Sequence, residues 1–216
     1  MLVKICGITN STDAKTARDA GADFVGLVFV ETSKRYLEIE QAEKILVGLG
    51  GEIKPVGLFA DQAILDVLDT VLCLGLKIIQ LHGRESPDYL NRLMKELPAC
   101  RFIKAMMITG PESIEEMQSY FRLIEDKSRI LAFLLDGPSG GGMGIGFNWS
   151  EVAHLLLAAK KDLPPIFLAG GLTIDNVSDA IRILNPDGVD VSSGVETAPG
   201  RKDAEKVQKF IALAKK

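Results

Sequence analysis

A cysteine, Cys6, stands where a short apolar run ends in a glycine-containing loop. The run Leu2-Val3-Lys4-Ile5 has the composition of a buried strand, and Gly7-Ile8-Thr9 follows it. A thiolate can remove a proton or attack an electrophile. Because side chains at the carboxyl ends of parallel strands carry the chemistry in folds built on parallel sheets, Cys6 is a candidate catalytic residue.

A carboxyl group occupies the equivalent place after the longest apolar run. Asp136 directly follows 130–135, and apolar neighbours that raise its pKa would make it a proton donor. A capping role in the next turn is the structural alternative. The loop 137–146 holds six glycines, which suits a lid or a close backbone approach to substrate, and it lacks the GxGxxG spacing of a dinucleotide site.

Charged residues interrupt three otherwise apolar runs. Residues i and i+2 of a strand share a face, so Lys4 is expected to point the same way as Cys6 and to lie one layer deeper. If the first and last strands are neighbours in a closed barrel, Asp190 pairs with Lys4. A purely structural buried pair and an electrostatic role in catalysis both fit this pattern, and Lys104 is the third such charge.

Two loops have the composition of an anion site. Gly170-Gly171 and Ser193-Gly194 each follow a short apolar run. In barrels of parallel strands, the loops after the last two strands commonly bind phosphate through backbone N–H groups. A tight turn explains either loop alone, but the two together favour phosphate.

Two further polar residues follow predicted strands. Arg35 could hold a carboxylate through two parallel hydrogen bonds, although an arginine in a polar loop is more often only solvated. His82 ends another run and could line the site, and a hydrogen-bonded structural imidazole is the alternative.

The elements that must position these residues alternate along the whole chain. Short β-rich runs are each followed by a segment with helical periodicity, and cap residues stand before several helices, at 10–13, 86–88 and 173–175. The predicted strands are 2–6, 24–29, 55–59, 78–81, 102–105, 130–135, 166–169 and 189–191. Eight such units predict an α/β fold, a single (β/α)8 TIM barrel over residues 1–216, with a doubly wound open sheet as the alternative.

The composition limits the class of binding partner. A net charge of −4 argues against a nucleic-acid binder, and no apolar segment is long enough to span a membrane. We expect a cytoplasmic protein with a small-molecule partner. Three cysteines without framework spacing predict free thiols, with Cys73 and Cys100 in the core.

Five blocks together resemble the phosphoribosylanthranilate isomerases of tryptophan biosynthesis. They run in the family's order from residue 2 to about residue 203, where Gly200-Arg201-Lys202-Asp203 is similar to the family's closing segment. The blocks are Lys4-Ile5-Cys6-Gly7-Ile8-Thr9, Gln80-Leu81-His82-Gly83, Leu134-Leu135-Asp136, Leu168-Ala169-Gly170-Gly171-Leu172 and 188–196.

The resemblance implies a (β/α)8 barrel that performs an Amadori rearrangement of a phosphosugar without a cofactor or a metal. It implies Cys6 as general base, Asp136 as general acid and Arg35 as the contact for the substrate's aromatic carboxylate. The base must act as a thiolate, and Lys4 is the nearest cation in sequence. Substrate contacts are expected at Arg35, Gly170, Gly171, Asp190, Ser193 and Gly194, with Lys4 and His82 as further lining residues.

The chain departs from the family's usual pattern at positions that carry no proton transfer: Lys34, Met143, Asn148 and Ile174. Two other functions stay open. The histidine-pathway aminoaldose isomerases catalyse the same rearrangement but use an aspartate where Cys6 stands, and a barrel that only binds phosphosugars would have lost catalysis. A cysteine hydrolase would need His82 beside Cys6 and would leave Asp136 without a role. The oligomeric state is expected to be monomer or homodimer.

Overall fold

A computed structural model describes residues 1–50, 53–137 and 149–216, with the side chains of 149–151 excepted. The predicted glycine-rich lid, with Met143 and Asn148, lies outside the described residues apart from Gly137. In the described part of the chain, no helix is long and apolar enough to cross a membrane.

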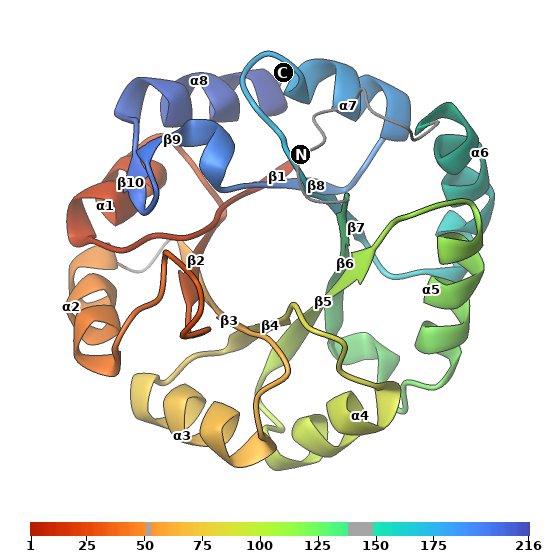
Figure 1. Ribbon diagram of the computed structural model, residues 1–216, viewed down its shortest axis with the longest axis horizontal. Helices are drawn as coiled ribbons and strands as arrows, with labels where there is room; N and C mark the ends of the chain where they lie inside the picture. Colours follow the sequence, from red (N-terminus) through yellow and green to blue (C-terminus); the bar gives the residue numbers. More distant parts are fainter. Residues whose placement is uncertain (51–52, 138–148) are drawn as a thin grey trace.

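Eight parallel strands close into a barrel, and helices surround it on the outside (Figure 1). Each strand pairs with its sequence neighbours, and β1 pairs with β8. The strands are β1 Leu2–Ile5, β2 Phe24–Val28, β3 Lys54–Phe59, β4 Ile78–Leu81, β5 Arg101–Met107, β6 Ile130–Asp136, β7 Ile166–Leu168 and β8 Gly188–Val191. The predicted (β/α)8 barrel is confirmed, and the open sheet is excluded because β1 and β8 are hydrogen-bonded neighbours.

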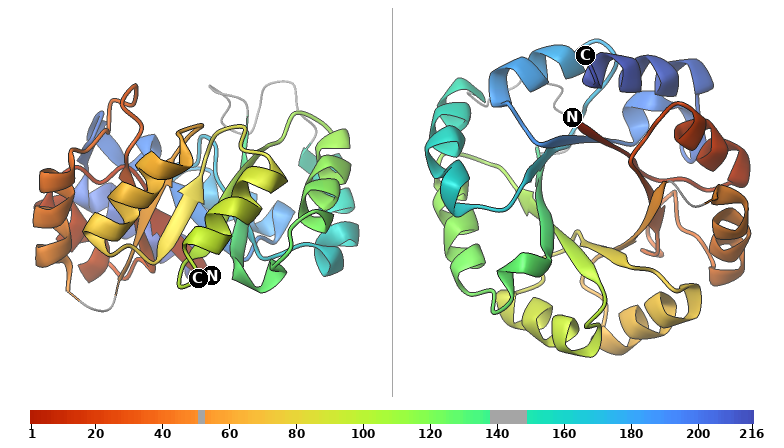
Figure 2. Two further views of the ribbon diagram at one scale, coloured as in Figure 1. Left: turned by 90° about the horizontal axis from the view of Figure 1, so that it is seen from below. Right: turned by 180° about the vertical axis from the view of Figure 1, so that it is seen from behind.

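A helix follows each barrel strand. The helices are α1 Ser11–Asp19, α2 Ile39–Leu49, α3 Ile64–Leu74, α4 Pro87–Glu96, α5 Glu112–Arg122, α6 Trp149–Ala159, α7 Val177–Leu184 and α8 Ala204–Ala214, with short 3-10 turns η1 Lys127–Arg129, η2 Lys160–Asp162 and η3 Ser193–Val195. Both chain termini lie at the face opposite the carboxyl ends of the strands (Figure 2).

Two of the three predicted helix starts are correct. The Asn10 side chain caps α1 by accepting from the N–H of Asp13, and the Ser86 hydroxyl caps α4 in the same way, with Pro87 in the first turn. The third start is displaced, because α7 begins only at Val177, after Asn176.

The barrel interior and the layer under the helices form separate clusters. Every second residue of a strand faces the barrel interior, and on β5 these residues are Ile103 and Ala105. Lys104 lies between them and therefore faces the helix layer, where its Nζ is 3.0 Å from Glu85 Oε2. Lys4 lies opposite Asp190 in the β1–β8 register, and their side chains meet inside the barrel, as predicted.

The three cysteines are free thiols, and one of them was placed wrongly by the sequence. Cys6 and Cys100 are buried, but Cys73 is exposed on α3. The buried residues of α3 are Val67 and Val71, one turn apart, and Cys73 lies about 200° around the helix from Val71. The prediction that Cys73 lies in the core, made from its apolar sequence neighbours, is therefore wrong.

A two-stranded hairpin after β8 was not predicted. Its antiparallel strands, β9 Glu196–Ala198 and β10 Arg201–Lys202, pair Glu196 with Lys202. The hairpin lies outside the barrel sheet, beside α1 (Figure 1), and the backbone N–H of Lys202 donates to the Asp13 carboxylate at 2.8 Å.

Candidate active site

A cavity of about 210 Å³ opens at the carboxyl ends of the barrel strands. Most of the predicted site residues gather there, although they come from loops far apart in sequence. The cavity is lined by Cys6, His82, Asp136, Ala169, Gly170, Gly171, Leu172, Asp190, Val191, Ser192 and Ser193. The thiol and the carboxyl singled out as proton-transfer groups thus share one pocket.

Cys6 lies above a buried ion pair. Lys4 is fully buried, and its Nζ donates to Asp190 Oδ1 at 3.0 Å. Gly26 on β2 makes room for this stack, since a Cβ there would come within 2.7 Å of Cys6 Sγ and 3.0 Å of Lys4 Nζ. The ammonium and the thiol therefore meet beside the same glycine, one layer apart.

The pKa of Cys6 is raised above its ordinary value, contrary to the expected bias toward thiolate. Burial is the largest cause, because it disfavours the charged form. The positive charge of Lys4 opposes that effect and Asp190 adds to it. The pKa of Lys4 is also raised, since the attraction of Asp190 and Cys6 outweighs its own burial. The pairing with Asp190 therefore favours the charged form of Lys4, while burial favours the neutral form of the Cys6 thiol.

We expect the thiolate of Cys6 to form at a higher pH than that of an ordinary cysteine. Because burial favours the protonated thiol, the thiolate absorbance that differs between wild type and Cys6→Ser should appear at a higher pH than that of an unperturbed cysteine. An ultraviolet absorbance titration of both proteins measures it, with a blocked cysteine peptide as the reference. A midpoint for Cys6 below that of the peptide would contradict the assignment.

Asp136 is held on two sides. Its Oδ2 lies 3.1 Å from His82 Nε2, and its Oδ1 lies against Gly170, where a Cβ would approach within 2.8 Å. His82 Nδ1 is in turn 2.8 Å from Gln80 Nε2. When the Gln80 amide donates to Nδ1, the imidazole carries its proton on Nε2 and donates to Oδ2. Among the residues that the structure describes, Oδ1 makes no hydrogen bond to another side chain and lies at the cavity.

Gln80 is a site residue that the sequence analysis missed. Its side chain is fully buried inside the barrel, and its Oε1 has no hydrogen-bond partner among the described residues. A signal was available, because Gln80 and His82 are two positions apart and so share one face of β4. Where this amide donates to Nδ1 of His82, it fixes the imidazole proton on Nε2, facing Asp136.

The two predicted anion loops touch each other. A Cβ at Gly194 would come within 1.9 Å of the Leu172 carbonyl oxygen, so only glycine allows this approach. Gly170 and Gly171 both have positive φ, +78° and +69°, which favours glycine. In the described part of the chain, no hydrogen bond is donated by the N–H groups of Gly171, Ser193 or Gly194. The loops therefore offer several free donors at the cavity wall.

Arg35 does not line this cavity, but it lies at its edge. Its side chain crosses Gly7, where a Cβ would meet Arg35 Cδ, and reaches Glu196 of the hairpin. The guanidinium donates from Nε to Oε1 at 2.8 Å and from Nη2 to Oε2 at 2.6 Å. The predicted carboxylate clamp thus already holds a carboxylate of its own chain.

A larger cavity lies elsewhere on the barrel. It measures about 620 Å³ and is formed by the loop after β2, the end of β3 and the start of α3. Its lining includes Glu31, Glu38, Asp66 and Asp69 but neither Cys6 nor Asp136. Volume alone therefore does not identify the reactive site.

The fold and the site together define a (β/α)8-barrel enzyme with a thiol, a carboxyl group and two touching glycine-containing loops at the barrel mouth. A family model described as N-(5'phosphoribosyl)anthranilate isomerase matches residues 3–213. This chain belongs to that family.

Curated relatives and solved structures agree with the family assignment. The N-(5'-phosphoribosyl)anthranilate isomerase of Pelobacter propionicus is 47% identical over 99% of this chain and 95% of its own length. The enzyme of the same name from Geobacter metallireducens is 43% identical over 99% and 98%. A crystal structure of phosphoribosyl anthranilate isomerase from Thermotoga maritima superposes with a TM-score of 0.86 at 37% identity, over 100% of this chain and 99% of that one.

One related structure contains a ligand. It is a phosphoribosyl anthranilate isomerase in complex with reduced 1-(o-carboxyphenylamino)-1-deoxyribulose 5-phosphate, with a TM-score of 0.84 and 35% identity over 100% of this chain and 98% of that one. That ligand combines a phosphate, an open sugar chain and an aromatic carboxylate.

Proposed function

We propose that this protein isomerises N-(5-phosphoribosyl)anthranilate to 1-(2-carboxyphenylamino)-1-deoxyribulose 5-phosphate in tryptophan biosynthesis, by general acid–base catalysis without a cofactor. The observation that carries the proposal is the meeting of Cys6 and Asp136 in one cavity whose wall is formed by the two glycine-rich loops. A proton donor, a proton acceptor and an anion site are what this rearrangement needs.

Asp136 acts first, as the general acid. Its proton passes to the ring oxygen of the ribose while the bond between that oxygen and C1 breaks, and the lone pair of the anthranilate nitrogen forms the C1=N iminium. Without this proton the ring would open to an alkoxide. Contact from His82 to Oδ2 orients the carboxyl for transfer from Oδ1.

Cys6 acts second, as the general base. Its thiolate removes the proton from C2, and the released electron pair forms the C1=C2 bond and neutralises the nitrogen. The resulting enol becomes the ketone when C1 gains a proton and the hydroxyl on C2 loses one. The iminium cation is therefore neutralised in the same step in which Cys6 acts as the base.

The raised pKa of Cys6 fits this order of events. A buried thiol is weakly ionised in the free site but is a stronger base once ionised. The iminium forms a positive charge beside Cys6 just before the base is needed, and that charge favours the thiolate. Since the thiolate is the active form, kcat/KM should rise as pH increases toward the pKa of Cys6.

The remaining groups bind the two ends of the substrate. The free N–H groups around Gly171, Ser193 and Gly194 suit the phosphate, and Arg35 suits the aromatic carboxylate. Asp190 contributes by holding Lys4 beneath Cys6. We take residues 1–216 to act as one domain, and the three free thiols are consistent with a cytoplasmic enzyme. A relative from Thermotoga maritima is described as dimeric, with engineered monomers, so monomer or homodimer is the range proposed here.

Loss of substrate fluorescence tests the activity. Purified protein mixed with freshly made phosphoribosylanthranilate should abolish the fluorescence of the substrate with catalytic turnover. The aminoaldose substrate of the histidine-pathway isomerases serves as the control. Turnover of that control alone would overturn the assignment, and binding of phosphosugars without turnover of either would identify a barrel that has lost catalysis.

A further inference from the structure

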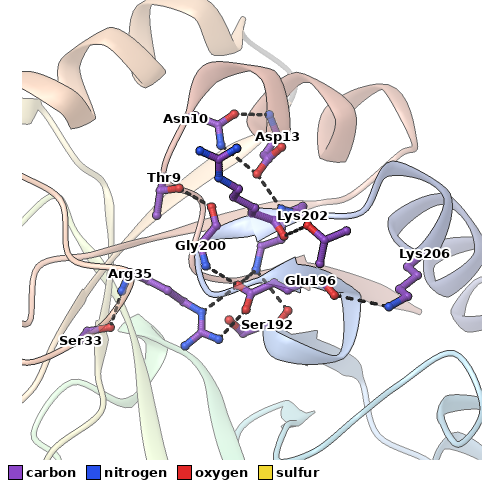
Figure 3. A network of polar contacts seen from close by, with 12 residues as sticks. Thr9, Asn10, Asp13, Ser33, Arg35, Ser192, Glu196, Gly200, Lys202 and Lys206 are labelled. Carbon is purple, nitrogen blue, oxygen red and sulfur yellow. Dashed lines mark hydrogen bonds and ion pairs between the residues drawn. The ribbon is translucent and has the colours of Figure 1, made fainter.

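A buried network of charged residues surrounds Arg35 at the barrel mouth (Figure 3). Arg35 reaches it from the loop after β2, while Glu196 and Lys202 come from the two strands of the β9–β10 hairpin. The Glu196 carboxylate accepts both Arg35 hydrogen bonds and one from Lys202 Nζ at 2.8 Å. One carboxylate thus lies between two cations.

Glu196 is fixed by more than these two ion pairs. Its side chain is 5% exposed, and Oε1 also accepts from the N–H of Gly200 at 3.3 Å. The two cations lower the pKa of Glu196 against the opposing effect of its burial. Glu196 is therefore ionised and held in one orientation, which fixes the plane of the Arg35 guanidinium.

Lys202 is buried just as deeply. Its side chain is 1% exposed, and its Nζ donates to the Ser192 carbonyl at 3.2 Å as well as to Glu196. Burial lowers the pKa of Lys202, while Glu196 opposes that effect. The hairpin is anchored to the barrel mouth by Thr9, whose hydroxyl donates to the Gly200 carbonyl at 2.5 Å. The network is therefore a fixed part of the fold.

The guanidinium keeps free donors in this arrangement. Arginine has five N–H groups, and Glu196 takes one on Nε and one on Nη2. Among the residues that the structure describes, the two N–H groups of Nη1 and the second one of Nη2 have no acceptor and are left for another carboxylate. The Arg35 side chain is 23% exposed, and a second carboxylate on the Nη1–Nη2 end of the fork would leave the bonds to Glu196 in place.

The charge count also favours a second carboxylate. Arg35 and Lys202 each contribute +1 and Glu196 contributes −1, so the network keeps one net positive charge. Without Lys202, Glu196 would neutralise Arg35. The charge of Lys202 also opposes, in small part, the rise that burial causes in the pKa of Cys6.

We propose that Glu196 and Lys202 are positioning residues that prepare Arg35 for the aromatic carboxylate of the substrate. Glu196 fixes the guanidinium across Gly7 with its free fork exposed, and Lys202 offsets the charge of Glu196 so that the fork stays attractive to an anion. This inference rests on the proposed function, since it assigns the carboxylate of that substrate to Arg35.

Calorimetric binding of two ligands tests the proposal. One is reduced 1-(o-carboxyphenylamino)-1-deoxyribulose 5-phosphate, and the other is the same compound without its carboxylate. Wild type should prefer the carboxylate compound. Glu196→Gln should lower that preference about 10-fold, the scale of one charge-assisted hydrogen bond, because the loss of a fixed guanidinium outweighs the gain in net positive charge. Binding of inorganic phosphate should stay unchanged in both proteins.

Three further variants separate positioning from general stability. Glu85→Gln removes the buried carboxylate that pairs with Lys104, and it should leave the preference for the carboxylate compound unchanged. Lys202→Met should lower the preference, and Lys202→Arg should restore it. In an Arg35→Ala background, Glu196→Gln should have no further effect on the preference.

The outcomes are distinct. The positioning role would be overturned if Glu196→Gln lost the same affinity for both ligands. It would also be overturned if Glu196→Gln kept its full effect on the preference in the Arg35→Ala background, or if wild type showed no preference for the carboxylate compound. A wild type that shows the preference and the expected variant effects but does not turn over phosphoribosylanthranilate would refute the proposed function and support the positioning role.

Discussion

Cys6→Ser is expected to lower kcat by about 100- to 10,000-fold, the usual contribution of one well-placed proton transfer. Serine fits the space beside Gly26, but its hydroxyl ionises far less readily than a thiol and cannot serve as the base at C2. The measurement is the rate of fluorescence loss at saturating substrate, compared with wild type. KM should change little, because the anion loops and Arg35 are untouched.

Cys100→Ser is the matched control. Cys100 is also buried, and its thiol lies 3.4 Å from the Leu76 carbonyl at the opposite end of the barrel strands. We expect it to lower thermal stability modestly and to leave kcat close to that of wild type. A Cys6→Ser enzyme with wild-type kcat, or an equal loss of kcat in Cys100→Ser, would refute the role of Cys6 as base.

Asp136→Asn is expected to lower kcat by a similar factor, about 100- to 10,000-fold. The amide keeps the shape of the carboxyl against Gly170 and can still accept from His82, but it has no acidic proton for the ring oxygen. Steady-state kinetics and thermal unfolding of the same preparation separate chemistry from folding.

Asp179→Asn provides the comparison for this variant. Asp179 is exposed on α7 and pairs only with Arg182 in the described part of the chain, so its loss should change neither kcat nor stability appreciably. If Asp136→Asn retained near wild-type kcat, ring opening would need another acid, and His82 would be the first candidate because it lines the same cavity next to Asp136.

The strands were predictable from sequence because parallel strands buried on both faces are continuous apolar runs. All eight predicted runs are strands, and their ends differ by at most two residues. Alternation along the first strand also placed Lys4 beneath Cys6 and opposite Asp190. These features depend on local pattern and on closure of the ring, and both are visible in a sequence.

The features that sequence did not give depend on burial and on contacts between distant loops. The pKa of Cys6 is raised because the effect of burial outweighs the opposing charge of Lys4, and the balance of these two effects can be seen only in a three-dimensional structure. Lys104 was recognised as a charge within a strand, but its partner Glu85 lies on a loop with no sequence signal for pairing.

The hairpin that holds Glu196 and Lys202 had a weak signal. Pro199-Gly200 marks a turn between short polar segments, which is typical of a hairpin, but the pattern is too short to predict strands. Its contact with Arg35 spans 161 residues along the chain. Only the closed ring, which brings the loop after β2 close to the loop after β8, places these side chains together.

The most direct test of the account is the fate of deuterium at C2 of the substrate ribose in single turnovers. If Cys6 removes the C2 proton, wild type should react more slowly with the deuterated substrate than with the undeuterated one. Cys6→Ser should lose the C2 deuterium more slowly than wild type, by the same factor by which its kcat falls. Loss of C2 deuterium at the wild-type rate in Cys6→Ser would contradict the account.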